Sequence, residues 1–252
     1  MPYAPPLSGI LKKGSKGDEV TELQNLLNYR LKPSPGLVVD GKFGPATDAA
    51  VRRFQSSKWL VIDGCVGPCT WSALYEAEEY VVYHAIKLVP QPTTSTCWAA
   101  STAMLKGIPI STVLQHNQGL FGKNGLPNDS EFTDPLRMKH YAAHNNLGLI
   151  LGQSWTARGF ANLMKSKGPL MLNILWNPAG YVTPDPNDPS QYLGSSGHMV
   201  VAHGIRGDGT EIGSTLRISD PWPPGVGKAA SFSYLSWMEQ HLTGTYQILH
   251  RM

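Results

Sequence analysis

The sequence predicts an α+β protein in which a small helical part precedes a part that mixes helices and strands. Two observations lead to this fold class. Up to about residue 79, apolar side chains recur at helical spacing and a short motif occurs twice, whereas from about residue 80 short apolar runs of strand length alternate with helical segments. Of the 252 residues, 41% are hydrophobic and 15% are charged, a composition that can form packed cores and argues against disorder.

An internal repeat organises the helical part. Residues 40–47 read Asp-Gly-Lys-Phe-Gly-Pro-Ala-Thr, and residues 63–70 read Asp-Gly-Cys-Val-Gly-Pro-Cys-Thr. Each copy is typical of an Asp-Gly turn followed by an apolar anchor, a glycine and a proline in the first turn of a helix, where the missing N–H is not needed. Together with the apolar spacing, the repeat predicts three helices between about residues 7 and 79. The apolar helical positions are Val20, Leu23, Leu26, Leu27, Leu31, Val51, Phe54, Trp71 and Leu74.

The mixed part is expected to begin with a helix over residues 95–106. Thr94 or Ser95 would cap the start of this helix, and Gly107 would end it. The stretch from 177 to 197 is rich in Pro, Asp, Asn, Gly and Ser and predicts a long exposed loop. Further helices are expected over residues 135–144 and 157–167, and strands over residues 169–176, 199–204, 216–220 and 246–249.

Cys97 stands in the first turn of the helix predicted over residues 95–106. The helix macrodipole and the N–H groups at that end favour a thiolate, which is the nucleophilic form of cysteine. Gln91 lies six residues upstream, where its side-chain amide would join the backbone N–H of Cys97 in an oxyanion hole. We therefore predict that Cys97 is a nucleophile and that Gln91 stabilises a tetrahedral intermediate.

A base and an orienting carboxylate follow later in the chain. His198 comes directly after a glycine at the mouth of an apolar strand, and Asp220 ends another predicted strand. The carboxylate would orient the imidazole and stabilise its charged form. A lone cysteine in an apolar helix is usually a small buried hydrophobe, but the glutamine spacing and the order of the three residues together favour catalysis.

The first 79 residues resemble the peptidoglycan-binding domain 1 family. The matching positions run through residues 7–78 and include both Asp-Gly turns. The resemblance implies recognition of the bacterial cell wall without catalysis, and it gives four candidate binding residues: Asp40, Phe43, Asp63 and Trp71. The alternative is that these four are turn and core residues.

The rest of the chain, over about residues 85–252, resembles the papain-like cysteine peptidases. This implies a papain-like domain with an N-terminal catalytic helix and an antiparallel sheet. Ser95 stands where papain's own signature has a glycine, and an aspartate replaces the asparagine of many papains. The avirulence-effector proteases of plant pathogens and the bacteriocin-processing peptidases are most similar in the blocks Gln91…Cys97-Trp98-Ala99-Ala100, Gly197-His198 and Asp220-Pro221.

The two resemblances predict a peptidoglycan-binding domain over residues 1–79, a linker over 80–90 and a papain-like cysteine peptidase domain over 91–252. They predict a peptidase or amidase that is directed to bacterial peptidoglycan and cleaves stem-peptide or cross-bridge amide bonds through an acyl-enzyme. One alternative is an effector protease that cleaves specific target-cell proteins and uses the wall domain for retention. The other is a non-catalytic binding protein with a decayed peptidase fold.

Composition limits the partners and the location. The net charge of +3 is far from the dense Lys/Arg pattern of a nucleic-acid binder. No stretch approaches the roughly 20 apolar residues that cross a bilayer, and no Sec signal is visible. We expect a protein delivered to the periplasm or cell wall as a phage-type lysin or an antibacterial effector, and in the second case a cognate immunity protein as a partner.

Cofactors and metals are not expected. If Cys97 stays a free thiol, Cys65 and Cys69 are left to form a disulfide, with two unpaired buried thiols as the alternative. His140 and His144 have the i, i+4 spacing of zinc ligands, but the glutamate of the H-E-x-x-H motif is absent between them. A solvated helix face is the simpler interpretation.

Overall fold

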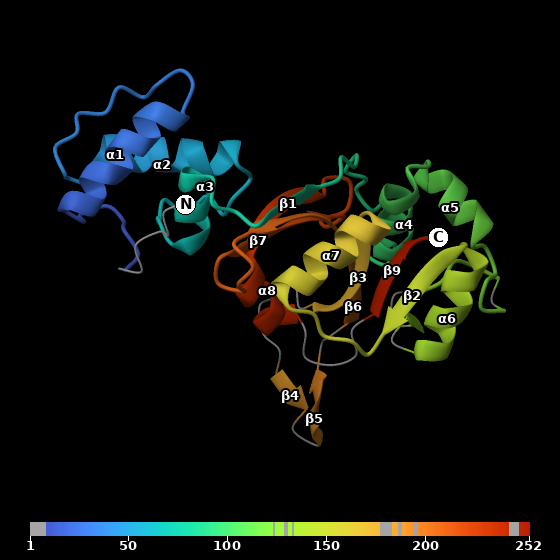
Figure 1. Ribbon diagram of the computed structural model, residues 1–252. Coiled ribbons are helices and arrows are strands. Elements are labelled where there is room, and N and C mark those ends of the chain that lie inside the picture. The colour runs from blue at the N-terminus through green and yellow to red at the C-terminus, as the bar shows by residue number, and fades with distance from the viewer. Residues whose placement is uncertain are drawn as a thin grey trace.

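The computed structural model describes residues 9–122, 124–128, 131–132, 134–176, 183–185, 188–193, 196–241 and 247–252. A helical N-terminal module is joined to a larger domain in which helices cover an antiparallel sheet (Figure 1). This arrangement confirms the predicted α+β class. None of the described helices is both long and apolar enough to cross a bilayer.

Three helices form the N-terminal module, as the apolar spacing predicted: α1 (Asp18–Arg30), α2 (Pro45–Ser57) and α3 (Pro68–Tyr75). The second and third helices both begin at the proline of the repeat. Proline fits there because the first residues of a helix have no carbonyl partner for their N–H groups. The apolar positions of the three helices meet in one core, which includes Val20, Leu23, Leu27, Val51, Phe54 and Leu74.

A buried glutamine holds the turn of the first repeat. The Nε2 group of Gln24 donates to Asp40 Oδ1 at 2.9 Å and to the Lys42 carbonyl at 3.1 Å. The Oε1 atom of the same side chain accepts from the Gly41 N–H at 3.0 Å. Because Gly41 has a φ of 66°, the turn needs a residue without a Cβ at this point.

The second repeat has the same arrangement around Gln55. Its Nε2 group donates to Asp63 Oδ1 at 2.9 Å and to the Cys65 carbonyl at 2.8 Å, and its Oε1 atom accepts from the Gly64 N–H at 3.0 Å. The sequence repeat is therefore also a repeat in three dimensions. The two glutamines satisfy backbone groups that would otherwise lie buried without partners.

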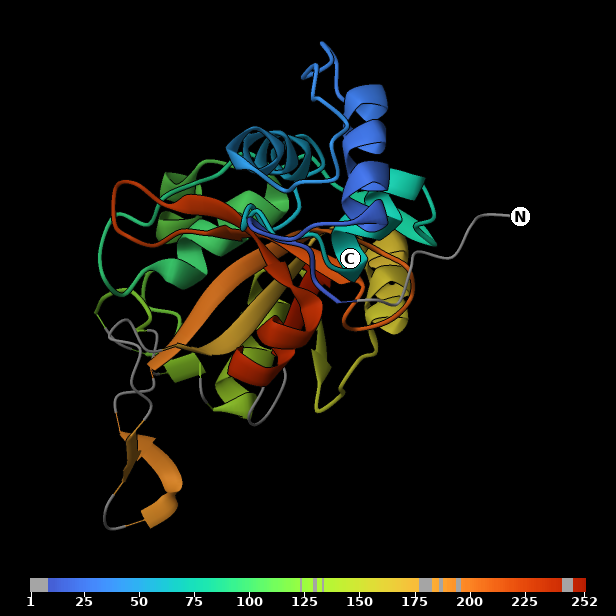
Figure 2. The ribbon, with the colours of Figure 1, turned by 90° about the vertical axis from the view of Figure 1, so that its left-hand side faces the viewer.

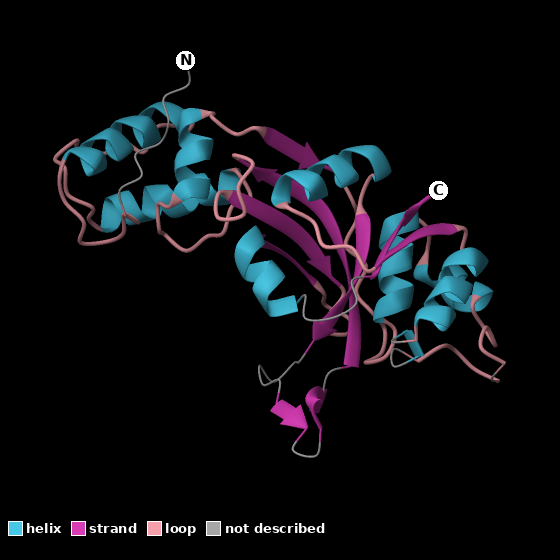
Figure 3. Ribbon diagram, turned by 60° about the horizontal axis from the view of Figure 1, so that its bottom comes forward, coloured by secondary structure: helices cyan, strands magenta, loops and turns pink. Residues whose placement is uncertain are grey.

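The described strands of the larger domain confirm the predicted antiparallel sheet (Figure 3). Seven strands form it, in the order β2-β9-β3-β6-β7-β8, with β1 paired to the second half of β6. The sheet therefore centres on β6, which pairs with three neighbours. The strands are β1 (Tyr80–Tyr83), β2 (Leu147–Leu151), β3 (Leu170–Trp176), β6 (Ser196–Gly207), β7 (Ser214–Asp220), β8 (Lys228–Ser233) and β9 (Gln247–Arg251).

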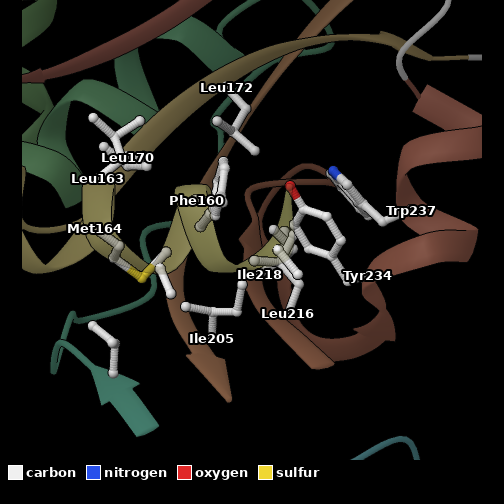
Figure 4. Packing of buried hydrophobic residues seen from close by; sticks show 14 of the residues in the cluster. Phe160, Leu163, Met164, Leu170, Leu172, Ile205, Leu216, Ile218, Tyr234 and Trp237 are labelled. Atoms are coloured by element: carbon white, nitrogen blue, oxygen red, sulfur yellow. The ribbon is translucent and has the colours of Figure 1, made fainter. Parts of the chain in front are cut away.

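Helices cover both faces of this sheet, because successive side chains of a strand point to opposite sides. On one face, α7 (Ala157–Lys167) and α8 (Tyr234–His241) pack against alternate strand residues such as Leu172 and Ile218 (Figure 4). On the other face, Met171 and Met199 belong to a core shared with the remaining helices. These are α4 (Cys97–Lys106), α5 (Ile110–His116) and α6 (Pro135–His144).

Several local predictions are confirmed and others are wrong. The helices at 135–144 and 157–167 have the predicted bounds, and Gly107 ends α4 with a φ of 67°. The first helix starts at Cys97 with Thr96 as its N-cap, so the predicted cap at Thr94 or Ser95 is wrong. The strand predicted over 199–204 is longer in both directions, and the predicted linker contains β1.

The loop predicted over 177–197 is wrong where the structure describes it. Strands β4 (Thr183–Asp185) and β5 (Asp188–Leu193) pair as a hairpin that projects from the sheet domain (Figure 2), and β6 begins at 196. Residues 177–182, 186–187 and 194–195 of this stretch lie outside the described residues, as do 1–8 of the predicted first domain and 246 of the predicted last strand. The prediction failed because it relied on composition, which does not report strand pairing.

The predicted disulfide between Cys65 and Cys69 is not formed, and both cysteines are free. Cys69 donates its thiol hydrogen to the Ile212 carbonyl of the sheet domain, with 3.3 Å between the two atoms. Cys69 therefore contributes to the contact between the module and the sheet domain instead of closing a loop within the repeat.

A buried arginine clamps the module to the sheet domain. Arg206, on β6, donates from Nε and Nη2 to the two carboxylate oxygens of Glu78, each at 2.5 Å, and from Nη1 to the Lys58 carbonyl at 2.5 Å. Its guanidinium also lies 5.0 Å from the ring centroid of Trp59. The side chains of Arg206 and Glu78 are only 6% and 9% exposed. Burial removes water from both charges, so each charge is stabilised by the other instead.

Trp59, which follows Lys58 in the chain, makes further contacts between the module and the sheet domain. Trp59 has a φ of 44°, and its carbonyl accepts from the Ser231 hydroxyl of β8 at 2.5 Å. The centroids of the Trp59 and Tyr83 rings are 5.8 Å apart. A Cβ added at Gly204 would lie 3.3 Å from the Trp59 indole. The absence of a side chain at Gly204 therefore makes room for the indole on the sheet.

The clamp predicts a large loss of stability when its arginine is removed. We expect Arg206→Met to lower the free energy of unfolding by about 3 kcal/mol, because Glu78 is left buried without a cation. Arg158→Met breaks an exposed pair with Glu79 and is the matched control, with an expected change below about 1 kcal/mol. Denaturant unfolding measures both, and equal effects would contradict the clamp.

Burial also predicts unequal reactivity of the two cysteines in the module. Desolvation raises the pKa of Cys69 to about 11, so at pH 8 only about one thiol in a thousand is the reactive thiolate. In a Cys97→Ala background, we expect iodoacetamide to modify Cys65 well before Cys69. The rate at Cys69 should rise about a hundredfold between pH 8 and pH 10, since the thiolate fraction grows tenfold per pH unit below the pKa. A pH-independent rate at Cys69 would contradict this.

Candidate active site

Cys97 is the first residue of α4 and is 1% exposed. Its helix is buried along almost its whole length, and the indole of Trp98 anchors the first turn by donating to the Ser95 carbonyl at 3.1 Å. As the first helical residue, Cys97 has an N–H that the helix itself does not use. The predicted position at a helix N-terminus is therefore correct, although the helix starts two residues later than expected.

His198 and Asp220 lie on the neighbouring strands β6 and β7 and contact each other directly. Nε2 of His198 lies 2.8 Å from Oδ1 of Asp220. The same carboxylate oxygen accepts from the Trp222 N–H at 2.9 Å, which fixes its direction. The two side chains are 4% and 14% exposed, so their interaction is only weakly screened by water.

The backbone of β6 brings the thiol to the histidine. The N–H of Met199, the residue after His198, donates to Cys97 Sγ at 3.3 Å. Such a donor favours the thiolate, because it stabilises negative charge on sulfur. The structure thus brings together three of the four residues that the sequence predicted as catalytic, although they lie far apart in the chain.

Gln91 is buried, and its backbone is tied to the segment that follows Asp220. Its N–H donates to the Pro221 carbonyl at 3.1 Å, and its carbonyl accepts from the Gly225 N–H at 2.9 Å. Its Nε2 donates to the Thr93 carbonyl at 2.6 Å. Since Nε2 carries two hydrogens, this bond leaves one for a second acceptor.

Asn173 on β3 is a polar residue beside this site that was not among the residues predicted from the sequence. It is the cross-strand partner of Met199, and its Nδ2 donates to Gln247 Oε1 at 2.8 Å and to the Phe132 carbonyl at 3.3 Å. These two acceptors fix the orientation of the amide, so that Oδ1 points over Gly197, 2.9 Å from where a Cβ would lie. An asparagine in the middle of an apolar strand was the signal available in the sequence.

The four candidate peptidoglycan-binding residues have different surroundings. Phe43 and Trp71 are each 2% exposed and belong to the core of the module, so they offer almost no surface to a ligand. Asp40 and Asp63 accept the glutamine hydrogen bonds of the two repeats, and the bond from Gln24 is the main reason why the pKa of Asp40 is lowered. Asp63 also lines a groove between the two parts of the protein.

No group of three or more metal-ligating side chains is placed to hold an ion within the described ranges. The rings of His116 and His144 stack with centroids 4.2 Å apart, and Nε2 of His144 lies 2.9 Å from the His116 carbonyl. His203 is buried on β6 away from Asp220, and desolvation lowers its pKa.

A family model described as papain-like cysteine protease AvrRpt2 matches residues 77–239. The chain belongs to this family. The protease is therefore a cysteine peptidase, as the order of its catalytic candidates predicted. A second model, for a peptidoglycan binding domain, matches residues 16–74, so the molecule combines a peptidoglycan-binding domain with a papain-like protease domain.

Individual relatives cover one part of the protease or the other. The zinc D-Ala-D-Ala carboxypeptidase of Streptomyces albus G is 50% identical over 54 residues, and the match spans only 20% of each chain. The SleB N-terminal domain is 36% identical, covering 27% of this chain and 92% of its own, with a TM-score of 0.26. The peptidase domain of Streptococcus ComA, a bi-functional ABC transporter, is 18% identical, covering 66% and 98%, with a TM-score of 0.40.

The packing of Asn173 predicts that Gly197 must stay a glycine. In Gly197→Ala, the Cβ would lie 2.9 Å from Asn173 Oδ1, so that either this amide, which Gln247 and Phe132 hold, or the backbone next to His198 would have to shift. We expect alkylation of Cys97 by iodoacetamide to slow by about tenfold, because the rate follows the thiolate that the histidine supports. The double variant Gly197→Ala/Asn173→Ala should recover most of the rate.

Gly125→Ala serves as the matched control, because a Cβ there meets nothing within 4 Å. If the double variant is as slow as Gly197→Ala alone, the contact with Asn173 does not explain the glycine.

Proposed function

We propose that this protease hydrolyses amide bonds of bacterial peptidoglycan, in the stem peptides or the cross-bridges. The observation that carries the proposal is the buried contact between the peptidoglycan-binding domain and the strand that bears His198. A module fixed in this way keeps the substrate at high effective concentration and in a constant orientation toward Cys97.

The proposed chemistry begins at Cys97. Sγ forms a bond to the carbonyl carbon of the scissile amide while the π electrons move onto the oxygen, and His198 accepts the thiol proton. Because Nε2 of His198 is engaged with Asp220, the proton moves through Nδ1. His198 then gives the proton to the leaving nitrogen, the C–N bond breaks and a thioester remains.

Hydrolysis of the thioester repeats the same steps with water. His198 takes a proton from the attacking water, the C–S bond breaks, and the carboxylate product leaves as the thiol is restored. The charged oxygen that forms in both halves is stabilised by the N–H of Cys97 and by the second hydrogen of the Gln91 amide. Asp220 keeps the imidazole oriented and stabilises its charged form.

Such an enzyme must reach the cell wall, so we propose a secreted or delivered protein. A phage-type lysin and an injected antibacterial effector both fit a chain that combines wall binding with peptide cleavage. In the second case, the producing cell needs a cognate immunity protein, which would block access to Cys97.

A second candidate function follows from the match to the AvrRpt2 family. It is an effector protease that cleaves defined proteins of a target cell, with the wall domain used for retention. This candidate predicts cleavage of protein substrates and no release of fragments from purified wall.

The deciding experiment is digestion of purified sacculi, with the soluble products identified by mass spectrometry. We expect wild type to release peptides with new carboxyl termini, and Cys97→Ala and His198→Ala to release none. His140→Ala is the matched histidine control, since this exposed residue lies outside the site, and it should retain full activity. Binding of wild type to sacculi without any cleavage would exclude the wall-hydrolase proposal and favour the second candidate.

A further inference from the structure

A groove of about 410 Å³ runs between the second repeat and the edge of the sheet domain. The module contributes Leu60, Asp63 and Thr70 to its walls, and the sheet domain contributes Ile212, Phe232 and Ser236. Neither part of the protein forms the groove alone. Its volume lies within the range of pockets that hold small ligands or short polymer segments.

The walls of the groove are held in place by contacts described above. The Cys69 thiol donates to the Ile212 carbonyl, and the Ser231 hydroxyl donates to the Trp59 carbonyl. The buried pair of Arg206 and Glu78 fixes the same interface. A ligand would therefore bind between surfaces that are already in position, so little of its binding energy would be lost in ordering the protein.

The lining favours ligand groups that are neutral or positively charged where they enter the groove. Among the described residues that line the groove, Asp63 is the only acidic side chain, and no lysine, arginine or histidine is present. Hydroxyl groups of Thr70 and Ser236 add donors and acceptors, and the ring of Phe232 adds an apolar wall. A sugar–peptide segment supplies hydroxyl and amide groups to this lining, and a basic amine of its stem peptide would pair with Asp63, whereas its carboxylates would have to lie outside the groove.

The groove also lies at a defined distance from the catalytic residues. Thr215, which lines it, and Asp220, which orients His198, are five positions apart on β7. At about 3.3 Å per residue, this separation is roughly 17 Å. Side chains five positions apart on a strand point to opposite faces, so a peptide that reaches from the groove to the candidate catalytic residues has to pass round the edge of the sheet and be longer than five residues.

We propose that this groove is a second substrate-binding site, which holds a sugar–peptide segment of peptidoglycan while a bond farther along the peptide lies at Cys97. The identity of the ligand rests on the proposed wall-hydrolase function. The two repeats then differ in role. Gln24 holds Asp40 in the same way as Gln55 holds Asp63, but only Asp63 faces the protease domain across the groove.

Binding is tested separately from cleavage, in the full chain with Cys97→Ala. The probe is a set of soluble disaccharide-peptide fragments, released from sacculi by a glycosidase and titrated by calorimetry. Ser236→Trp fills the groove from an exposed position on α8 and should weaken binding at least tenfold. Asp63→Asn keeps the acceptor for Gln55 but removes the charge, and should weaken binding by about tenfold.

Two comparison variants make the result specific. Ser56→Trp adds the same side chain at an exposed position of α2 outside the groove and should bind as the parent does. Asp40→Asn makes the equivalent change in the first repeat and should have the smaller effect of the two aspartate variants. If Ser236→Trp and Asp63→Asn bind normally, or if only Asp40→Asn weakens binding, the groove proposal is overturned.

The two proposals fail in different ways. If wild type digests sacculi but the groove variants bind fragments normally, the second site alone is excluded. If the protein does not digest sacculi but still binds fragments through the groove, the wall-hydrolase proposal is excluded. The groove would then remain a wall-binding site.

Discussion

The pairing of strand β6 with its three neighbours is the constraint on which the rest of the molecule depends. One end of this strand carries His198 and the N–H that reaches the thiol of Cys97. The other end carries Arg206, which holds the peptidoglycan-binding domain. Because strand register determines which residues lie side by side, the same strand positions both the peptidoglycan-binding domain and the candidate catalytic residues.

Burial has a chemical purpose at the catalytic end. Cys97 and His198 are buried and Asp220 is largely shielded from water, which strengthens the hydrogen bond between the imidazole and the carboxylate. Close packing continues nearby, where a Cβ at Gly197 would lie 2.9 Å from Asn173 Oδ1, so a larger residue there would require the amide or the backbone to shift.

At the other end, one local motif has two different surroundings. Both repeats use a buried glutamine to hold an Asp-Gly turn, and this explains why the sequence repeats there. The first turn faces outward, whereas the second forms a wall of the groove beside the protease domain. The two copies therefore have the same internal bonds, and only the second lies against the sheet domain.

The sequence by itself determined what depends on near neighbours in the chain. Helical spacing and prolines located the three helices of the module, Gly107 ended α4, and the order of Gln91, Cys97, His198 and Asp220 indicated the chemistry. Tertiary structure alone decided that Phe43 and Trp71 are core residues and that Asn173 lies opposite Met199. It also decided that residues 183–185 and 188–193 form paired strands instead of a loop, and that Arg206 joins the two domains. The physical reason is the range of the forces involved: capping and turn preferences act over a few residues, while burial and strand register depend on which distant segments come to share the same space.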